Sequence, residues 1–316
     1  MAKVYIGIGH GGSDNGAVGY IVEDATNLKM GKACRDYLKA RGIDTMISRE
    51  SDVNVSIATK TSQANKWGAD LALDIHNNAG RGDGAEAYHS IYYGTGKTLS
   101  DNILDELKKI GQNSRGSKTK RGTNGDYFAF IRNTNMPAVI TEGVFVDNKA
   151  DAAQADTDAE CKAFGEAIAK GVIRTLISMG KYVENKDVYY TTHIQDYGWQ
   201  GKLDDMKTWK KNGQTSGTTG QSKRLEGIII DSSYAQFVYQ VHCQDYGDMT
   251  PVSNGELAGT TGQSKRLESI RIDCDKKIKY RVHCQDYGWM PWVSNGQWAG
   301  TKGESKRLEA IEIKFV

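Results

Sequence analysis

The chain has 316 residues, and its 41 basic and 39 acidic side chains leave a formal net charge of +2. Because no region is strongly basic, the composition excludes a typical nucleic-acid-binding protein. No apolar run approaches the roughly 18 residues that a membrane span needs, so we expect no membrane anchor, and the length is enough for about two domains.

The first domain is predicted at residues 1–179, where strand and helix patterns alternate. Short apolar runs typical of buried strands occupy residues 4–8, 43–47, 71–75 and 138–140. Helical patterns occupy residues 28–38, 99–110 and 164–177. This alternation predicts an α/β domain with a mostly parallel, twisted sheet flanked by helices, and functional groups of such sheets gather at the carboxyl ends of the strands.

The stretch "VYIGIGHGGSDNGAVG" near the N-terminus contains the glycine spacing G-x-G-x-x-G of a dinucleotide-binding loop. That loop must open directly into a helix, whereas the turn-forming "SDNGAVGYIV" intervenes here, so the pattern does not predict a nucleotide site. The stretch instead places His10 just past a strand. We expect Gly11 and Gly12 to leave room beside it for an ion and substrate, and Gly7 and Gly9 to serve strand packing.

A second apolar strand, "DLALDIHNNAG", delivers His76 in the same way, and two strand-end histidines can converge on one ion. Hydrolytic zinc sites commonly take two histidines and one carboxylate and leave a position for water. Either Glu23 or Asp24 can supply that carboxylate, although Asp24 is also suited to capping the first helix. Glu142 lies within the apolar strand "AVITEGVF", where a lone carboxylate is costly to bury. It is the candidate proton acceptor.

Five segments occur in the order "GHGGSDNGAVG", "EDATNL", "DIHNNAG", "GAEAYHS" and "RNTNMPAVITEGVFVDNKAD". Through them, residues 3–177 resemble the zinc-dependent N-acetylmuramoyl-L-alanine amidases of the amidase-3 family. The resemblance implies that His10, Glu23 and His76 hold one Zn²⁺ and that Glu142 is catalytic. It also implies hydrolysis, by zinc-activated water, of the amide bond between N-acetylmuramic acid and L-alanine in peptidoglycan.

Four further residues belong to the predicted site or its surroundings. Asn78 and Arg132 are candidates for binding substrate; the alternatives are that Asn78 caps a turn and that Arg132 braces the loop before the last strand. We expect His89 to be structural and Glu86 to support the site from behind. The chain departs from the family where residues 58–60 lack an arginine, which bears on stability or substrate grip rather than on the metal site.

The rest of the chain consists of three repeats with a period of about 41 residues. Each copy contains "H-x-Q-D-Y-G" followed by "G-T-x-G-x-S-K-R-L-E" within strand-like segments. One copy cannot bury its apolar face alone, so we expect a threefold all-β domain, either a β-prism or a β-trefoil. The predicted boundaries are a linker at 180–187 and, within a second domain of residues 188–316, repeats at about 188–231, 238–273 and 279–316.

Residues 188–316 resemble the clostridial hydrophobic repeats with a characteristic tryptophan, known as ChW, which implies attachment to the cell envelope. The tryptophan is Trp199 in the first copy and Trp289 in the third, but Asp248 replaces it in the middle copy. Trp199 and Trp289 are therefore the candidate wall-binding residues of this second domain.

Other polar residues recur in the same frame of every copy. Repetition predicts structural hydrogen bonding rather than a threefold metal site for the three histidines, His193, His242 and His283. The segment "SKRLE" indicates a turn, a strand start and an internal Arg–Glu contact. Binding of an anionic wall polymer is the weaker interpretation of its three lysines, Lys223, Lys265 and Lys306.

No secretory signal pattern precedes the first strand, and the five cysteines are odd in number and widely spaced. We therefore expect reduced thiols and synthesis in the cytoplasm. A cytoplasmic chain with a wall substrate is typical of a phage endolysin. Such an enzyme reaches the peptidoglycan after a holin or similar protein breaches the membrane. The expected host is a Gram-positive bacterium, here a clostridial one. The alternatives are a host autolysin of the same activity and a non-catalytic wall-binding protein.

Overall fold

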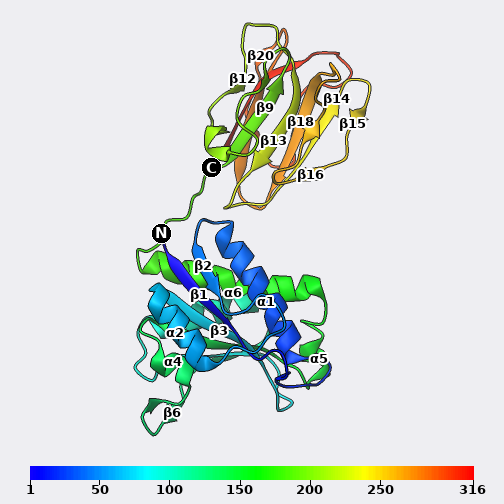
Figure 1. Cartoon of the computed structure of the whole chain (residues 1–316). Helices are drawn as coiled ribbons and strands as arrows, with labels where there is room; N and C mark the ends of the chain where they lie inside the picture. Colours follow the sequence, from blue (N-terminus) through cyan, green and yellow to red (C-terminus); the bar gives the residue numbers. More distant parts are fainter. The chain divides into compact units, whose positions relative to one another are not determined.

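Two units divide the chain between Glu184 and Asn185, and the computed structural model describes residues 1–316 (Figure 1). The division lies within the segment that the sequence predicts as a linker. None of the helices is both long and apolar enough to cross a lipid bilayer. All five cysteines are free thiols, and four of them are buried.

The sheet of the first unit has six strands in the order β2-β1-β3-β8-β4-β5. Neighbouring strands are parallel except for β8 and β4, which are antiparallel, so the predicted mostly parallel sheet is confirmed. A separate short hairpin pairs β6 with β7. The strands are β1 (Lys3–Ile8), β2 (Asp44–Ile47), β3 (Leu71–Asn78), β4 (Ala85–Tyr88), β5 (Ser114–Lys118), β6 (Arg121–Gly122), β7 (Gly125–Asp126) and β8 (Ala138–Phe145).

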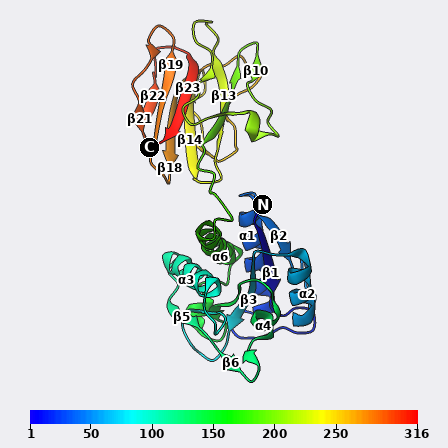
Figure 2. The ribbon, with the colours of Figure 1, turned by 90° about the vertical axis from the view of Figure 1, so that its left-hand side faces the viewer.

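Helices cover both faces of this sheet. They are α1 (Glu23–Lys39), α2 (Ile57–Trp67), α3 (Thr95–Lys109), α4 (Ala129–Asn133), α5 (Lys149–Ala152) and α6 (Asp158–Ser178). Figure 2 shows α3 and α6 on one side and α2 on the other. Val4 and Ile6 of β1 share a core with α1, α3 and α6, whereas Tyr5 packs with α2 and α4. Alternate residues of the strand thus point into different layers.

Local sequence fixes several helix ends. Thr157 and Glu160 form a capping box at the start of α6, in which each side chain accepts from the other's backbone N–H. Ser56 caps α2, and Gly68 ends that helix in the left-handed conformation, with φ of 68°. No side chain caps α1, whose first residue is Glu23. The Glu23 carboxylate turns towards His10 and His76 at the ends of β1 and β3.

Three five-stranded sheets surround one apolar core in the second unit. Each sheet contains the two long strands of one repeat, namely β9 (Tyr189–Ile194) with β13 (Leu225–Asp231), β14 (Phe237–Cys243) with β18 (Leu267–Cys274), and β19 (Ile278–Cys284) with β23 (Leu308–Phe315). The shorter elements are β10 (Gly198–Trp199), β11 (Lys210–Lys211), β12 (Ser216–Gly217), β15 (Gly247–Asp248), β16 (Val252–Ser253), β17 (Ala258–Gly259), β20 (Gly288–Trp289), β21 (Val293–Ser294), β22 (Trp298–Gly300) and a 3-10 turn, Met206–Thr208.

Exchanged strands close the three repeats into a ring. Strand β17 of the second repeat pairs with β13 of the first, and β22 of the third pairs with β18 of the second. Strand β12 of the first repeat pairs with β23 of the third, which completes the circle. The predicted threefold all-β unit is therefore confirmed. Of the two architectures expected, separate sheets around a shared core correspond to the β-prism.

A buried tyrosine in each repeat fastens this ring. The hydroxyl of Tyr190 accepts a hydrogen bond from the backbone N–H of Ile313, in the third repeat, at 3.2 Å and donates to the carbonyl oxygen of Gln214 in its own repeat. Tyr239 and Tyr280 likewise each accept from a backbone N–H of the preceding repeat and donate to a carbonyl oxygen of their own repeat. Each buried hydroxyl is thus satisfied while it links two repeats.

Candidate active site

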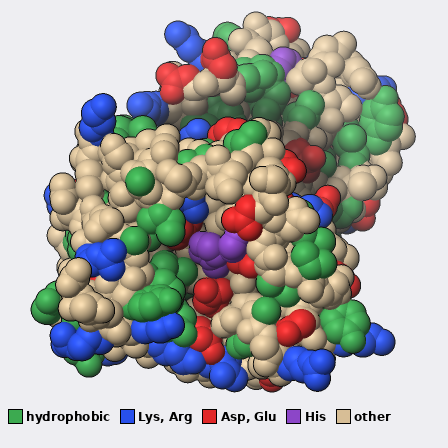
Figure 3. Space-filling model, turned by 60° about the horizontal axis from the view of Figure 1, so that its bottom comes forward, with side chains coloured by type: hydrophobic (Ala, Val, Ile, Leu, Met, Phe, Trp, Pro, Cys, Tyr) green, Lys and Arg blue, Asp and Glu red, His purple; other side chains and the backbone are tan.

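Three side chains converge at the carboxyl ends of β1 and β3. His10 follows β1, Glu23 begins α1, and His76 lies near the end of β3. One possible ligand atom of each lies within 4.8 Å of the others. Oε1 of Glu23 lies 3.1 Å from Nδ1 of His76 and 3.4 Å from Nε2 of His10. Figure 3 shows histidine beside acidic side chains in a hollow of this face. The structure thus brings together the three residues predicted as metal ligands.

Two glycines make room for these side chains. A Cβ atom on Gly9 would lie 2.3 Å from the ring of His76. A Cβ atom on Gly16 would lie 2.6 Å from both Oε2 of Glu23 and Cδ2 of His10. Any larger residue at either position would displace a side chain of the group. The prediction that Gly9 serves only strand packing is therefore wrong, because it clears space for His76.

Two other glycines of the same stretch also differ from the prediction. Cβ atoms on Gly11 and Gly12 would meet the backbone of residues 53–54 at 2.4 Å and 3.2 Å. These glycines therefore let two loops approach each other, rather than leaving room for an ion and substrate. Gly7 lies against Asp74 and Leu73 of the neighbouring strand β3, where a Cβ atom would lie 2.4 Å from Oδ1 of Asp74, so this glycine serves strand packing as predicted.

The carboxylate of the converging group is Glu23 rather than its neighbour Asp24. Oε2 of Glu23 accepts from the backbone N–H of Ala17 at 2.9 Å, and Oε1 accepts from that of Asn77 at 3.1 Å. Asp24 instead accepts from the N–H of Ala25 at 2.7 Å. Burial acts to raise the pKa of Glu23, but hydrogen bonds from the two histidines hold that pKa far below its usual value. Glu23 is therefore a fixed anion that faces two imidazole rings.

Each histidine of the group has a second carboxylate behind it. Nδ1 of His10 lies 2.9 Å from Oδ2 of Asp14, and Nε2 of His76 lies 3.4 Å from Oδ2 of Asp74. The other nitrogen of each ring faces Glu23. A carboxylate that accepts the outer N–H of a histidine orients the ring so that its inner nitrogen can bind a metal. Sequence reasoning missed both carboxylates, although strand alternation places Asp74 and His76 on one face of β3.

Lys60 of α2 holds Asp74 in place. Its Nζ lies 2.9 Å and 3.1 Å from the two carboxylate oxygens, and the two residues are only 3% and 2% exposed. Burial acts to raise the pKa of Asp74, but the positive charges of Lys60 and His76 hold that pKa below its usual value. Lys60 thus contacts the His10–Glu23–His76 group through Asp74, whereas the sequence led us to expect the segment 58–60 to bear only on stability or substrate grip.

Glu142 of β8 lies opposite His76 of β3 and Glu86 of β4 in the strand register. Its carboxylate has no hydrogen-bond or ion-pair partner within the chain. Burial raises the pKa of Glu142 to about 7; the charge of His76 acts to lower it, and the carboxylates of Glu23 and Glu86 act to raise it. A carboxylate in this setting can exchange a proton near neutral pH.

Glu86 lies beside Glu142 on β4 and is 3% exposed. It accepts hydrogen bonds from Tyr88 Oη at 3.2 Å and from Arg115, and Lys118 Nζ lies 2.7 Å away. Burial acts to raise the pKa of Glu86, but Lys118 and Arg115 hold it below its usual value. Sequence reasoning missed these two cations of β5, whose one signal was the basic run "SRGSKTKR". They keep Glu86 charged next to Glu142.

Two of the remaining predicted residues have local roles. Asn78 ends β3, and its Oδ1 accepts from the backbone N–H of Ala79 at 2.8 Å, which is the turn-capping alternative. His89 is buried, and its Nδ1 lies 2.8 Å from the carbonyl oxygen of Ser90. This contact agrees with the structural role expected of His89.

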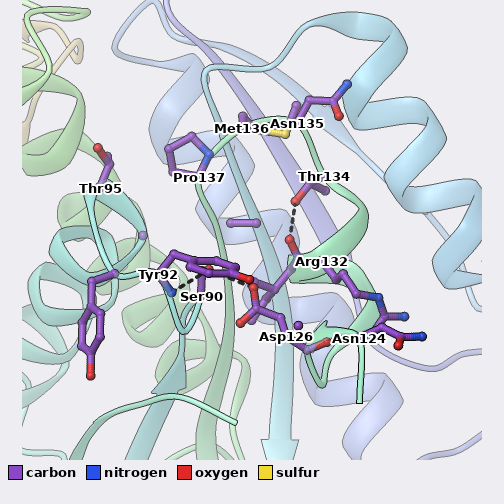
Figure 4. Close-up of a pocket in the computed structure, with 15 residues that line it drawn as sticks. Ser90, Tyr92, Thr95, Asn124, Asp126, Arg132, Thr134, Asn135, Met136 and Pro137 are labelled. Atoms are coloured by element: carbon purple, nitrogen blue, oxygen red, sulfur yellow. Dashed lines mark hydrogen bonds between the residues drawn. The ribbon is translucent and has the colours of Figure 1, made fainter. Parts of the chain in front are cut away.

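Arg132 lies on the wall of a polar cavity of about 330 Å³ (Figure 4). It donates to the backbone oxygens of Asp126 at 2.7 Å and Tyr127 at 3.2 Å, so it braces this loop. The cavity meets β8 at Ala138. At about 3.3 Å per residue, that position is roughly 13 Å along the strand from Glu142. The structure therefore does not bring Arg132 to the His10–Glu23–His76 group.

The two candidate wall-binding tryptophans pack against their own repeats. Trp199 and Trp289 are half-buried, and each meets a histidine ring edge-on at a centroid distance of 5.5 Å. Asp248 occupies the same position in the middle repeat, and it pairs with Lys302 of the third repeat at 2.7 Å. The tryptophan contact is therefore not a threefold feature of the unit.

The other repeated polar residues contact one another. Each histidine Nδ1 lies close to a carboxylate, at 3.1 Å for His193 to Glu226, 2.6 Å for His242 to Asp248 and 3.1 Å for His283 to Glu309. None of them joins a group of metal-ligand geometry. The expected Arg–Glu contact occurs in every copy, at 2.8 Å for Arg224 to Glu226, 2.7 Å for Arg266 to Glu268 and 2.7 Å for Arg307 to Glu309.

Two family profiles match the chain. The family described as "N-acetylmuramoyl-L-alanine amidase" matches residues 4–174. The family described as "Clostridial hydrophobic W", or ChW, matches residues 193–231, 242–275 and 283–316. These profiles agree with both resemblances seen in the sequence.

Curated relatives and solved structures are similar to parts of the chain. N-acetylmuramoyl-L-alanine amidase CwlM of Bacillus licheniformis is 36% identical over 65% of this chain and 79% of its own length. The endolysin of Bacillus phage SPP1 is 35% identical over 56% of this chain and 67% of its own length. Among structures, Cwp6 from Clostridium difficile has a TM-score of 0.54 and 34% identity, covering 55% of this chain but only 29% of Cwp6. The catalytic domain of the amidase CwlV from Bacillus (Paenibacillus) polymyxa has a TM-score of 0.51 and 25% identity, covering 56% of this chain and 99% of that domain.

Proposed function

Because the chain belongs to the N-acetylmuramoyl-L-alanine amidase family, we propose that its first unit hydrolyses the amide bond between N-acetylmuramic acid and L-alanine in peptidoglycan. One observation carries this proposal. His10, Glu23 and His76 converge, and Glu142 lies opposite His76 on the adjacent strand. Two imidazoles and two carboxylates in this arrangement suit metal-assisted hydrolysis.

The donor set fits a single zinc ion held by His10, Glu23 and His76. Two imidazole nitrogens and one carboxylate are a common ligand set of hydrolytic zinc sites. The nitrogens that face Glu23 are the ones left free by Asp14 and Asp74. A zinc ion bound there would supply Lewis-acid chemistry, which polarises a carbonyl and makes water a nucleophile near neutral pH.

Glu142 is the proposed proton carrier. Its unpartnered carboxylate takes a proton from the attacking water as the new C–O bond forms at the lactyl carbonyl carbon. Glu142 then gives that proton to the nitrogen of L-alanine as the C–N bond breaks. The products are a lactyl carboxylate on the glycan and a free amine on the stem peptide. Glu86, held by cations, favours the step by raising the proton affinity of its neighbour.

The second unit is proposed to attach the enzyme to the wall of a clostridial, Gram-positive host. Support comes from the ChW profile, which covers all three repeats, and from the similarity of the first unit to Cwp6 from Clostridium difficile. Attachment would keep the first unit close to its insoluble substrate.

We further propose that the protein is a phage endolysin. Support comes from the similarity to the SPP1 endolysin. A host autolysin of the same activity is the alternative, and production in a clostridial host separates the two. An endolysin lyses the culture only when a holin is co-produced, whereas lysis without a holin would favour the autolysin.

End-group analysis of digested walls tests the proposed reaction. Purified clostridial walls are incubated with the zinc-loaded protein, and new amino groups and new reducing sugars are measured. The proposal predicts free amino groups on L-alanine without new reducing termini. New reducing termini would instead indicate cleavage of the glycan.

A further inference from the structure

Each repeat presents the same exposed tyrosine. Tyr197, Tyr246 and Tyr287 are 60%, 54% and 56% exposed, and each follows an exposed aspartate. Other positions on the surface of the repeats have diverged; one of them is occupied by Tyr189, Val238 and Lys279. Packing explains why buried residues recur in all three copies, but it does not explain identical exposed rings.

A second segment of the same repeat holds each exposed ring in place. Tyr197 Oη donates to Oε1 of Gln221 at 3.1 Å, and Lys223 Nζ lies 2.6 Å from Oδ2 of Asp196. In the second repeat, Tyr246 donates to Gln263 at 2.7 Å and Lys265 lies 2.5 Å from Asp245. In the third repeat, Tyr287 donates to Glu304 at 2.7 Å and Lys306 pairs with Asp286. The ring is thus part of a small, preformed cluster, which here is called the tyrosine platform.

Backbone strain recurs at every tyrosine platform. The aspartate before the tyrosine has φ of 68°, 66° and 67° in Asp196, Asp245 and Asp286. The serine before the lysine has φ of 56°, 55° and 56° in Ser222, Ser264 and Ser305. Glycine adopts this left-handed conformation without strain, so the side chains themselves are being retained. The aspartate is explained by its lysine, whereas the serine hydroxyls have no partner and lie exposed beside the platform.

The chemistry of the platform points to a neutral, polar ligand with an apolar face. The aspartate neutralises each lysine, so no free cation is offered to an anionic polymer. What remains is an aromatic face bordered by hydroxyl, amide and carboxylate groups. A pyranose ring matches this surface, because its C–H groups can lie on the negative face of the aromatic ring while its hydroxyls reach the polar rim.

We propose that Tyr197, Tyr246 and Tyr287 form three equivalent saccharide-binding sites for a wall glycan, an inference that rests on the proposed wall attachment of the second unit. The half-buried Trp199 and Trp289 then shape the repeats without contacting sugar. Three weak sites on one rigid unit bind a repetitive polymer far more tightly than one site does.

Sedimentation with purified clostridial walls tests this proposal in the full chain. All proteins carry Glu142→Gln so that the walls stay intact. The test variant replaces all three tyrosines by alanine, and single Tyr→Ala variants accompany it. The matched control replaces three other exposed apolar residues of the same unit by alanine, Leu203, Val238 and Leu257. Thermal unfolding of each variant checks that the fold is retained.

We expect the triple tyrosine variant to lose on the order of 100-fold in apparent wall affinity, with smaller losses in the single variants and none in the control. Equal binding by the triple variant and the parent would overturn the tyrosine sites while leaving wall attachment intact. Failure of the parent itself to sediment would overturn wall attachment, and this inference with it.

Two further arms define the ligand. The triple Tyr→Phe variant keeps the rings but loses the hydroxyl contacts that hold them, so we expect a loss of affinity clearly smaller than that of the triple alanine variant. A loss as large as that of the alanine variant would overturn ring stacking. Walls stripped of accessory polymers with hydrofluoric acid separate the two saccharide sources: retained binding assigns the sites to the glycan strand, and lost binding assigns them to an accessory polysaccharide.

Discussion

Oδ2 of Asp74 lies 3.4 Å from Nε2 of His76, two residues further along the same face of β3. The contact leaves Nδ1 of His76 facing Glu23. Behind the contact, Lys60 binds both oxygens of the Asp74 carboxylate. One imidazole of the proposed zinc site is therefore positioned by a buried ion pair between β3 and α2.

Asp74→Asn tests this positioning. The substitution removes the charge that favours an outer N–H on His76, so we expect zinc affinity to fall by about 10- to 100-fold. Competition with a chromophoric chelator measures the affinity directly and does not depend on activity. Asp36→Asn, an exposed carboxylate of α1, is the control and should bind zinc like the parent. Unchanged affinity in Asp74→Asn would show that Asp74 has no part in holding the ring.

Lys60→Met tests the ion pair from its other end. It removes the nearest positive charge from the buried Asp74 carboxylate, so we expect the free energy of unfolding to fall by about 3–5 kcal/mol. The double variant Lys60→Met/Asp74→Asn removes both charges and should recover part of that loss. Urea unfolding curves provide the values. A double variant less stable than the sum of the two single changes would contradict the pairing.

The ion pairs of Glu86 should make the free energy of unfolding depend on pH. Its pKa in the folded chain lies below its ordinary value of 4.5, because Lys118 and Arg115 outweigh the effect of burial. A depressed carboxyl pKa stabilises the fold above the unfolded pKa, and this contribution is lost as the pH falls through the folded pKa. Glu86→Gln should therefore lower the unfolding free energy at about pH 7 and matter less at about pH 3. The reverse trend in urea unfolding would rule out this pairing.

Tyr190→Phe probes the closure of the repeat ring. Loss of the hydroxyl leaves the N–H of Ile313 and the carbonyl oxygen of Gln214 without their partner, which should cost about 1–3 kcal/mol in the unfolding of the second unit. Hydrolysis of a soluble muropeptide should not change. Tyr234→Phe, whose hydroxyl has no hydrogen-bond partner within the chain, is the control. Equal melting temperatures of the two variants would argue against the ring closure.

The fold of the first unit was predictable where apolar runs are long. Strands β1, β3 and β8 follow from such runs, and so do most of helices α1, α3 and α6. Helix α2 has the sequence "IATKTSQANKW", whose polar composition gives little periodic signal. The short strand β5 is missed for the same reason. It gains its stability from its neighbour in the sheet, which local sequence does not reveal.

The candidate site was likewise predictable only in part from the sequence. The strand-end pattern was enough to pair His10 with His76, but the choice of Glu23 over Asp24 rested on the family resemblance. The structure adds to the site Asp14, which lies beside His10, and the ion pair between Lys60 and Asp74, which lies beside His76. Lys60 lies 14 residues before its partner on another element, so no local pattern connects them. The ion pair between Lys60 and Asp74 becomes visible only when tertiary packing is known.

Zinc binding and wall hydrolysis by Glu142→Gln, measured on the same preparation, separate metal binding from proton transfer. We expect this variant to keep one zinc ion and to bind walls, yet to release amino groups at a rate lower by about 10²- to 10⁴-fold. Glu166→Gln, a partly exposed glutamate of α6, should hydrolyse walls like the parent. Parent-like hydrolysis by zinc-loaded Glu142→Gln would contradict the assignment of Glu142 as proton carrier.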